Sequence, residues 1–302
     1  MERRKFIKNA ALGSIILPDL VFGLNSCDIK KNVQTITDLH QYEPNLRDRL
    51  WMWGHGPGTT NGLYNIPTGN NIDMADAIDY MGIPNICVIR WEGKPEPPFD
   101  EYIKQFKKTK RVVWSIVDGA PQDFNQKKTW GFELTEKMPN LTGLCCDDFF
   151  GIIPNLPQLQ TVEQLQALKK EVGNLKRKID LSCVVYSTEL QPERKGHLNS
   201  FDTIFFWTWH ATDLVKLEEN FTKYRQIVPD KPTLLGIYMW DFGNSKPVPI
   251  ELMKLQLDFA LKKFKEREIE GMIFHCTPLV DLGLEAVDYS RNWIAEHAAV
   301  TR

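Results

Sequence analysis

Eight short apolar runs recur along the chain, and an aromatic or ionisable residue stands at or just after the end of each. They occupy residues 50–53, 85–89, 111–117, 141–146, 181–185, 203–206, 234–239 and 272–274. Stretches with a helical pattern separate them. Continuous apolar strands that alternate with helices are typical of a parallel sheet covered by helices. The pattern therefore predicts an α/β fold.

Helical spacing of apolar residues predicts helices over 74–80, 99–107, 162–175, 214–224, 250–264 and 286–295. Eight strand–helix units favour closure into a (β/α)8 TIM barrel, which typically takes about 250 residues as one domain. An open doubly wound sheet would need a Gly-rich GxGxxG turn after a strand, and the sequence has none. The Gly-, Asn-, Thr- and Pro-rich stretch 54–71 predicts a long first loop over the barrel mouth.

The N-terminal segment has the features of an export leader rather than of a folded element. Arg3 and Arg4 precede a Phe, a Lys and an apolar stretch, and this run resembles the twin-arginine export signal. An ordinary amphipathic helix is the alternative. The apolar stretch is broken by Pro18 and Asp19 and is shorter than the roughly 20 residues that span a bilayer.

A second resemblance concerns Cys27. Leu24 stands three residues before it, as in a bacterial lipobox, although Asn25 departs from the usual small residue. The resemblance implies a protein exported to the periplasm or cell surface and anchored to the membrane only by a lipid on Cys27. We therefore expect a leader over 1–27, a polar tether over 28–45 and a single barrel domain over 46–302.

The composition restricts the expected binding partners more than it restricts the expected fold. The chain has 302 residues, 42% of them hydrophobic and 25% charged, which is ordinary for a globular protein. A formal net charge of -2 gives no basic footprint for nucleic acid. A small, neutral or weakly charged ligand is the expected partner, with no cofactor. The sequence does not predict the oligomeric state.

The remaining cysteines lie in or next to the apolar runs, at Cys87, Cys145, Cys146, Cys183 and Cys276. No CxxC spacing supports a zinc knuckle or a redox motif. Buried free thiols are the prediction.

Three carboxylates that follow predicted strands are the strongest catalytic candidates, because parallel strands of a barrel deliver their ends to one rim. Asp147 and Asp148 follow the fourth run, and Asp241 follows the seventh. Because neighbours on a strand face oppositely, we expect only one of the adjacent pair to face the mouth, while the other caps a helix or orients an Arg. For Asp241 the alternative is a turn residue before Gly243.

These segments and the architecture resemble barrel glycoside hydrolases, many of which place an acid pair at the ends of strands four and seven. The resemblance implies that Asp147 or Asp148 is the general acid and Asp241 the nucleophile or base, or the reverse. Many such enzymes use Glu at both places. The DxxDxDxE motif of the chitinase group is also absent here.

Aromatic residues at the strand ends are a second indication, because sugar rings offer C–H faces that stack on them while the hydroxyls need polar neighbours. Core packing for the aromatics, structural hydrogen bonds for the histidines and rim ion pairs for the charged residues are the alternatives. The candidate carbohydrate-binding residues are Trp53, His55, Arg90, Trp91, Asp118, Tyr186, Glu189, Trp207, Trp209, His210, Tyr238, Trp240 and His275.

Two other functions are compatible with the same residues. A metal-dependent barrel hydrolase or isomerase would draw on the Asp and His residues, but no HxH follows the first strand and no His pair is spaced i, i+4, so no metal site is predicted. A non-catalytic surface lipoprotein that binds glycans would keep the aromatic rim without a working acid pair.

Overall fold

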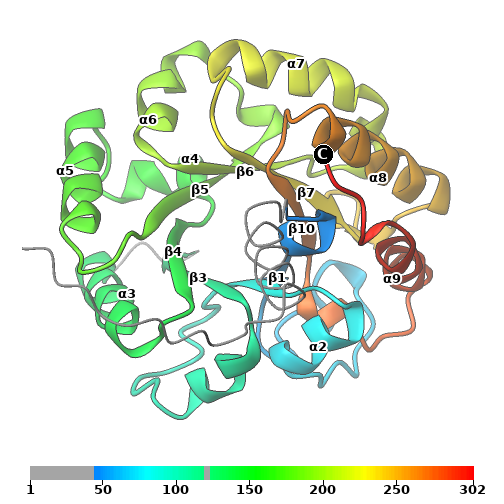
Figure 1. Cartoon of the computed structure of the whole chain (residues 1–302), viewed down its shortest axis with the longest axis horizontal. Helices are drawn as coiled ribbons and strands as arrows, with labels where there is room; N and C mark the ends of the chain where they lie inside the picture. Colours follow the sequence, from blue (N-terminus) through cyan, green and yellow to red (C-terminus); the bar gives the residue numbers. More distant parts are fainter. Residues whose placement is uncertain (1–43, 119–122) are drawn as a thin grey trace, which may run out of the picture. The chain divides into compact units, whose positions relative to one another are not determined.

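The computed structural model describes residues 44–118 and 123–302, with 44–302 forming one compact unit. The predicted leader, Cys27 and nearly all of the predicted tether lie outside the described residues. Eight parallel strands close into a barrel in the order β1-β10-β7-β6-β5-β4-β3-β2 (Figure 1). The expected (β/α)8 TIM barrel is confirmed.

The barrel strands lie within one residue of the predicted bounds. They are β1 (Leu50–Gly54), β2 (Asn85–Val88), β3 (Arg111–Val117), β4 (Leu141–Cys146), β5 (Asp180–Tyr186), β6 (Thr203–Trp207), β7 (Thr233–Tyr238) and β10 (Gly271–His275). The prediction succeeds because strands buried on both faces need unbroken apolar runs. The ring closes where β1 pairs with β10, with Trp53 opposite His275.

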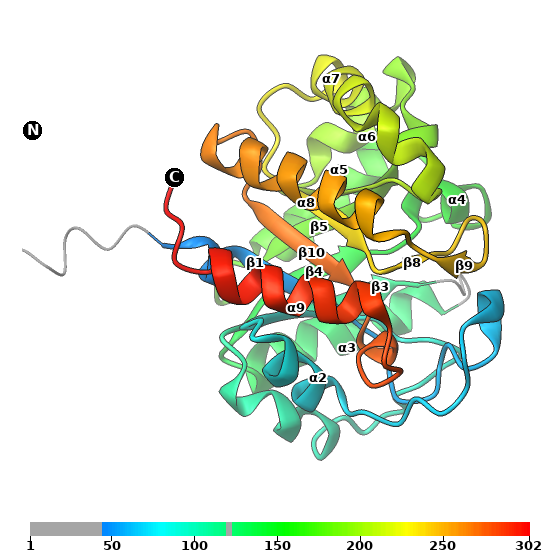
Figure 2. The same ribbon diagram turned by 90° about the vertical axis from the view of Figure 1, so that its right-hand side faces the viewer.

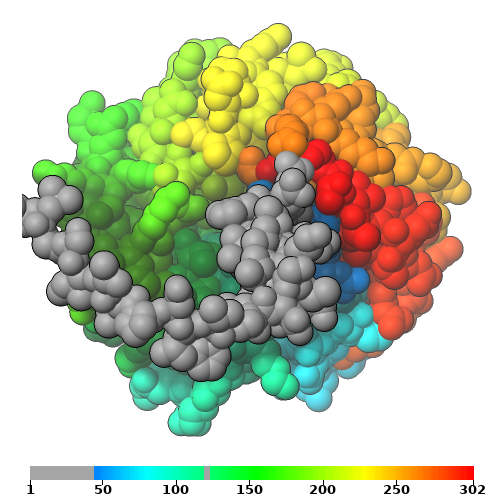
Figure 3. Space-filling view, viewed as in Figure 1, coloured from blue at the N-terminus to red at the C-terminus, as the bar shows by residue number. Residues whose placement is uncertain are grey.

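Helices surround the barrel (Figure 1), and the colours of the space-filling view pass round the molecule in sequence order (Figure 3). Those that match expectation are α2 (Met74–Met81), α5 (Val162–Gly173), α7 (Leu217–Ile227), α8 (Ile250–Lys265) and α9 (Glu285–His297). The helix expected over 99–107 is instead the 3-10 helix η3 (Tyr102–Lys108), and the start of 214–224 belongs to η7 (Ala211–Lys216).

The helix α3 (Phe124–Lys137) was not predicted, because its buried face mixes apolar and polar residues. Phe124 and Leu134 share that face with Lys127, Gly131 and Thr135. A Cβ on Gly131 would lie 2.6 Å from Cγ2 of Ile116, so the helix approaches β3 through a glycine. Hydrophobic periodicity cannot detect such a contact.

Short elements fill the connections and were also not predicted. They are α4 (Phe149–Ile152), α6 (Lys195–Ser200), β8 (Trp240–Asp241), β9 (Lys246–Pro247) and the 3-10 helices η1 (Leu46–Arg49), η2 (Leu63–Asn65), η4 (Ile153–Asn155), η5 (Ser187–Glu189), η6 (Pro192–Arg194) and η8 (Thr277–Leu279). Figure 2 shows β8, β9 and the long loop after β1 beyond one end of the barrel, and the chain's C-terminus at the other.

The five cysteines that the structure describes are free and buried, as expected for core thiols. Among the described residues, no helix combines the length and apolar character needed to cross a membrane.

Gly236 in β7 makes room for a large ring at the centre of the barrel. A Cβ at this position would lie 2.0 Å from Cε3 of Trp207 in the neighbouring strand β6. Trp207 is 1% exposed. The indole therefore takes the volume that a side chain at residue 236 would need.

We expect Gly236→Ala to lower the free energy of unfolding by about 1 to 3 kcal/mol, because an overpacked core must move the indole or the strand. Denaturant unfolding followed by tryptophan fluorescence measures the change. Gly151→Ala is the control, since a Cβ there meets nothing within 4 Å. Equal stability of the two variants would contradict the close contact.

Candidate active site

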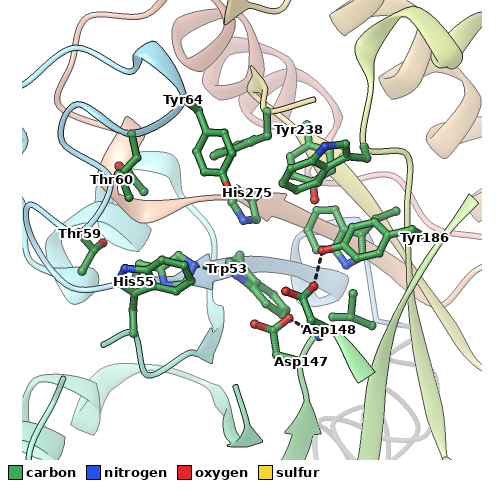
Figure 4. Close-up of a pocket in the computed structure, with 16 residues that line it drawn as sticks. Trp53, His55, Thr59, Thr60, Tyr64, Asp147, Asp148, Tyr186, Tyr238 and His275 are labelled. Carbon is green, nitrogen blue, oxygen red and sulfur yellow. Dashed lines mark hydrogen bonds between the residues drawn. The ribbon is translucent and has the colours of Figure 1, made fainter. Parts of the chain in front are cut away.

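A cavity of about 110 Å³ opens at the C-terminal rim of the barrel, where sequence reasoning expected the chemistry. Aromatic rings make up most of its wall, and two carboxyl groups project into it (Figure 4). The residues that line it are Trp53, His55, Thr59, Thr60, Leu63, Tyr64, Trp91, Asp147, Asp148, Val184, Tyr186, Trp207, Trp209, Tyr238, Phe242 and His275.

Ten of these lining residues are sequence candidates, drawn from five of the eight barrel strands and the loops that follow the strands. Sequence reasoning missed Thr59, Thr60, Leu63 and Tyr64, although it placed their loop over the mouth. It also missed Val184, which lies inside β5, and Phe242, which directly follows the candidate Asp241 in the sequence. Loop residues are harder to foresee because no periodicity fixes which way their side chains point.

Glu189 and His210 lie in a groove that adjoins the cavity. The two hollows share Tyr64, Asp148, Tyr186 and Trp209. Glu189 accepts a hydrogen bond from the backbone N–H of Tyr186 (3.0 Å), which fixes the end of β5. These candidates are therefore placed beside the cavity rather than in its wall.

Arg90, Asp118 and Trp240 lie outside the cavity lining and contact the protein itself. The Arg90 guanidinium donates to the carbonyls of Gly93 (2.8 Å) and Pro95 (3.0 Å), holding the loop after β2. Asp118 forms a buried ion pair with Lys127 of α3 (2.6 Å). The Trp240 indole N–H donates to the carbonyl of Tyr64 (3.0 Å) and ties the long loop to the rim.

Asp147 and Asp148 both line the cavity, which corrects the expectation that they point to opposite sides. The pair follows β4, and Asp148 adopts a left-handed conformation with φ 44°. That conformation ends the alternation of an extended strand. The backbone N–H of Asp148 donates to Oδ1 of Asp147 (2.8 Å). The Tyr186 hydroxyl donates to Oδ1 of Asp148 (2.7 Å).

The surroundings of the two carboxyls differ. Burial, together with the negative charge of Asp148, raises the pKa of Asp147 well above its ordinary value. Burial also raises the pKa of Asp148, but the hydrogen bond from Tyr186 opposes this by stabilising the carboxylate. Burial keeps the pKa of Tyr186 itself well above 10, so the phenol stays a donor. Asp147 is thus the more deeply buried carboxyl and lies beside the charge of Asp148, and both conditions favour its protonated form.

Asp241, which was expected to be the second catalytic carboxylate, lies outside the cavity wall. It is 1% exposed and is not among the described residues that line the cavity. Its Oδ1 accepts from the backbone N–H of Ala211 (3.2 Å) and of Asn244 (3.1 Å), and the Asn244 amide donates to Oδ2 (2.9 Å). A catalytic role for Asp241 stays a prediction, and these contacts favour the alternative of a turn-stabilising residue.

His55 and His275 are neutral near pH 7, because burial lowers the pKa of His55 to about 4 and that of His275 well below its ordinary value. Across the parts of the chain that the structure describes, no group of three or more His, Cys, Asp or Glu side chains is arranged to hold a metal ion.

Comparison with known proteins supports the barrel fold but does not identify the reaction. No family model matches the chain, and no curated protein matches it significantly. Among solved structures, it is similar to the catalytic domain of a chitinase from Pyrococcus furiosus, with 13% identity, a TM-score of 0.53, and 84% of this chain and 97% of that chain covered.

Two further neighbours share the barrel. A Bacteroides thetaiotaomicron protein assigned as an α-L-fucosidase has 11% identity and a TM-score of 0.56, with 86% of this chain and 98% of that chain covered. An Acinetobacter baumannii protein assigned as a 2-pyrone-4,6-dicarboxylic acid hydrolase has 14% identity and a TM-score of 0.50, with 84% and 96% covered. At these identities the likeness establishes the barrel fold alone.

The raised pKa of Asp147 predicts a pH-dependent stability. A raised pKa favours folding below the ordinary value of the carboxyl, and this contribution is lost as the pH rises through the raised pKa. We expect Asp147→Asn to gain stability relative to wild type with rising pH, by up to about 1.4 kcal/mol per pH unit. Denaturant unfolding across a pH series measures it.

Asp288→Asn serves as the control, because Asp288 is exposed on α9. Its unfolding curve should follow the wild-type pH dependence. Parallel pH dependences for wild type and Asp147→Asn would contradict the assignment of a proton to Asp147.

Proposed function

We propose that the protein is a glycoside hydrolase whose acid pair is Asp147 and Asp148. The observation that carries the proposal is the position of these two carboxyls, with unequally raised pKa values, inside a cavity walled by aromatic rings. Hydrolysis of a glycosidic bond needs one carboxyl that holds a proton and a second that is ionised. Several structural neighbours are barrel glycosidases, which agrees with this reaction class.

In the proposed reaction Asp147 is the general acid, because it is the more deeply buried carboxyl, while the Tyr186 hydroxyl stabilises the carboxylate form of Asp148. Its proton passes to the glycosidic oxygen while the bond from that oxygen to the anomeric carbon breaks, and the bonding electrons stay on the oxygen. The Asp148 carboxylate, oriented by the Tyr186 hydroxyl, stabilises the positive charge that develops on the sugar. A water oxygen then bonds to the anomeric carbon, and its proton restores Asp147.

The aromatic wall supports a carbohydrate as the substrate. The rings of Trp209, Tyr238 and Phe242 meet one another at centroid separations of 5.4 to 5.9 Å. The Tyr64 ring packs against Trp209 and Phe242 from the long loop, at 6.0 and 5.3 Å. Such a cluster offers apolar faces for the C–H side of a sugar ring, while the carboxyls serve its hydroxyls.

We expect Asp148→Asn to reduce kcat by about two to four orders of magnitude while keeping glycan affinity, because an amide cannot supply the carboxylate charge. Asn also tolerates the left-handed conformation. The assay uses methylumbelliferyl glycosides of N-acetylglucosamine, L-fucose, glucose, galactose and xylose. Asp241→Asn is the comparison, and its placement outside the cavity predicts a loss of less than about tenfold.

Each outcome decides between named alternatives. A large loss in Asp241→Asn with normal folding would restore the expected strand-seven carboxylate. A protein that binds glycans with unchanged affinity in both variants, but never cleaves them, is the non-catalytic binder. Activity that depends on an added divalent metal would support the metal-dependent hydrolase or isomerase instead.

We also propose export and lipid anchoring, on the strength of Arg3, Arg4 and Cys27. A twin-arginine leader carries folded proteins, and a lipid on Cys27 would hold the barrel at the membrane surface through the polar tether. A glycan substrate outside the cytoplasm fits such a location.

Cys27→Ser should move the full-length protein from the membrane fraction to the soluble fraction of a bacterial host, because the lipid is attached through the thiol. Cell fractionation with immunoblotting measures the shift. Ser26→Ala is the control, since it keeps a small residue beside the cysteine. Unchanged membrane association of Cys27→Ser would rule out this anchor.

A further inference from the structure

Four rings form the floor of the cavity, and we refer to Trp53, His55, Trp207 and His275 as the floor cluster. Trp53 lies 5.6 Å from Trp207 and 6.0 Å from His275, measured between ring centroids. His55 lies 6.0 Å from His275 and 6.5 Å from Trp53. All four line the cavity, and Trp53, His55 and His275 are labelled in Figure 4.

The hydrogen bond between Trp53 and His55 fixes the tautomer of the histidine. The indole Nε1–H of Trp53 donates to Nε2 of His55 (3.2 Å). An indole nitrogen can only donate, so Nε2 must be the unprotonated nitrogen of the ring. Because burial lowers the pKa of His55 to about 4, the ring is neutral near pH 7 and carries its one proton on Nδ1.

That Nδ1–H has no hydrogen-bond partner among the described residues, although His55 is only 8% exposed. The indole Nε1–H of Trp207 in the same floor cluster likewise has none. A buried donor without an acceptor costs about 1 to 3 kcal/mol, and few occur in native proteins. Two of the rings that line the cavity therefore carry buried N–H donors that have no acceptor among the described residues.

The backbone holds His55 firmly in this position. Its N–H donates to Oγ1 of Thr277 (2.9 Å), and the Thr277 hydroxyl donates back to the carbonyl of His55 (2.6 Å). These two bonds join the loop after β1 to the segment after β10. The ring is thus fixed at its backbone and at Nε2, leaving Nδ1–H as its one group without a protein partner.

We propose that His55 is a specificity-determining residue that donates its Nδ1–H to an oxygen of the bound sugar, with Trp53 as the residue that positions it. This inference rests on the proposed function, because it names one contact of that substrate. The acceptor is a hydroxyl or carbonyl oxygen on the sugar. A hydroxyl that accepts from His55 keeps its own proton for a carboxylate of the acid pair.

Two substitutions distinguish the proposed contact of His55 with the sugar from its contact with Trp53. The amide nitrogen of Asn lies near the position of imidazole Nδ1, so His55→Asn keeps a donor for the sugar and loses the acceptor for Trp53. The longer Gln reaches the position of Nε2, so His55→Gln keeps the acceptor for Trp53 and loses the donor. The probe is the methylumbelliferyl glycoside from the panel that wild type cleaves with the highest kcat/KM.

We expect His55→Gln to raise KM by about tenfold with a smaller effect on kcat, and His55→Asn to stay within about threefold of wild type, as the loss of one neutral hydrogen bond implies. Glycan titration of the Asp148→Asn background, followed by tryptophan fluorescence, measures the same differences without turnover. The reverse order, with His55→Gln unaffected and His55→Asn impaired, would show that His55 serves only the Trp53 contact and would overturn the inference.

A measurement on the unsubstituted protein keeps the test decisive if a variant misfolds. Nitrogen NMR of histidine-labelled protein should show His55 protonated at Nδ1 and shifted on addition of the probe. Protonation at Nε2 would overturn the inference. If the wild-type protein neither binds nor cleaves any glycoside of the panel, the proposed function itself is overturned. If the wild type cleaves a glycoside and His55→Gln cleaves it equally well, only the inference about His55 is overturned.

Discussion

Parallel pairing round a closed ring is the constraint on which every other feature of this protein depends. Because all eight strands run the same way, residues distant in sequence end at one rim. The closing pair, β1 with β10, sets Trp53 opposite His275 and lets Thr277 hold the backbone of His55. Without closure, the first and last strands would be open edges and the cavity would lack its floor.

Exclusion of water sets the electrostatics of the rim. Burial favours the neutral form of three groups that line the cavity, because it raises the pKa of Asp147 and lowers those of His55 and His275. Against this background the two adjacent acids have different partners: Asp148 accepts from the Tyr186 hydroxyl, and Asp147 accepts from a backbone N–H. Two carboxyls that are identical in sequence thereby acquire different proton affinities.

The sequence predicts the barrel and most of the cavity wall, because both follow from apolar strands and from the residues at their ends. It does not predict that Asp147 and Asp148 face the same way, since that depends on one left-handed residue. The direction of the Asp241 carboxylate is set by Asn244 and by the N–H of Ala211. The first partner lies three residues along the chain and is a recognisable turn signal, whereas the second comes from another loop.

The indole of Trp207 occupies the volume that a side chain at Gly236 would need. The two positions are therefore coupled: a relative with a smaller residue at 207 has room for a methyl group or more at 236, whereas a larger residue at 236 displaces the indole. Because the indole also forms part of the cavity floor, this pair sets how deep the cavity is. Exchanging bulk between the two strands would move the floor toward or away from a bound sugar while leaving the carboxyls where they are.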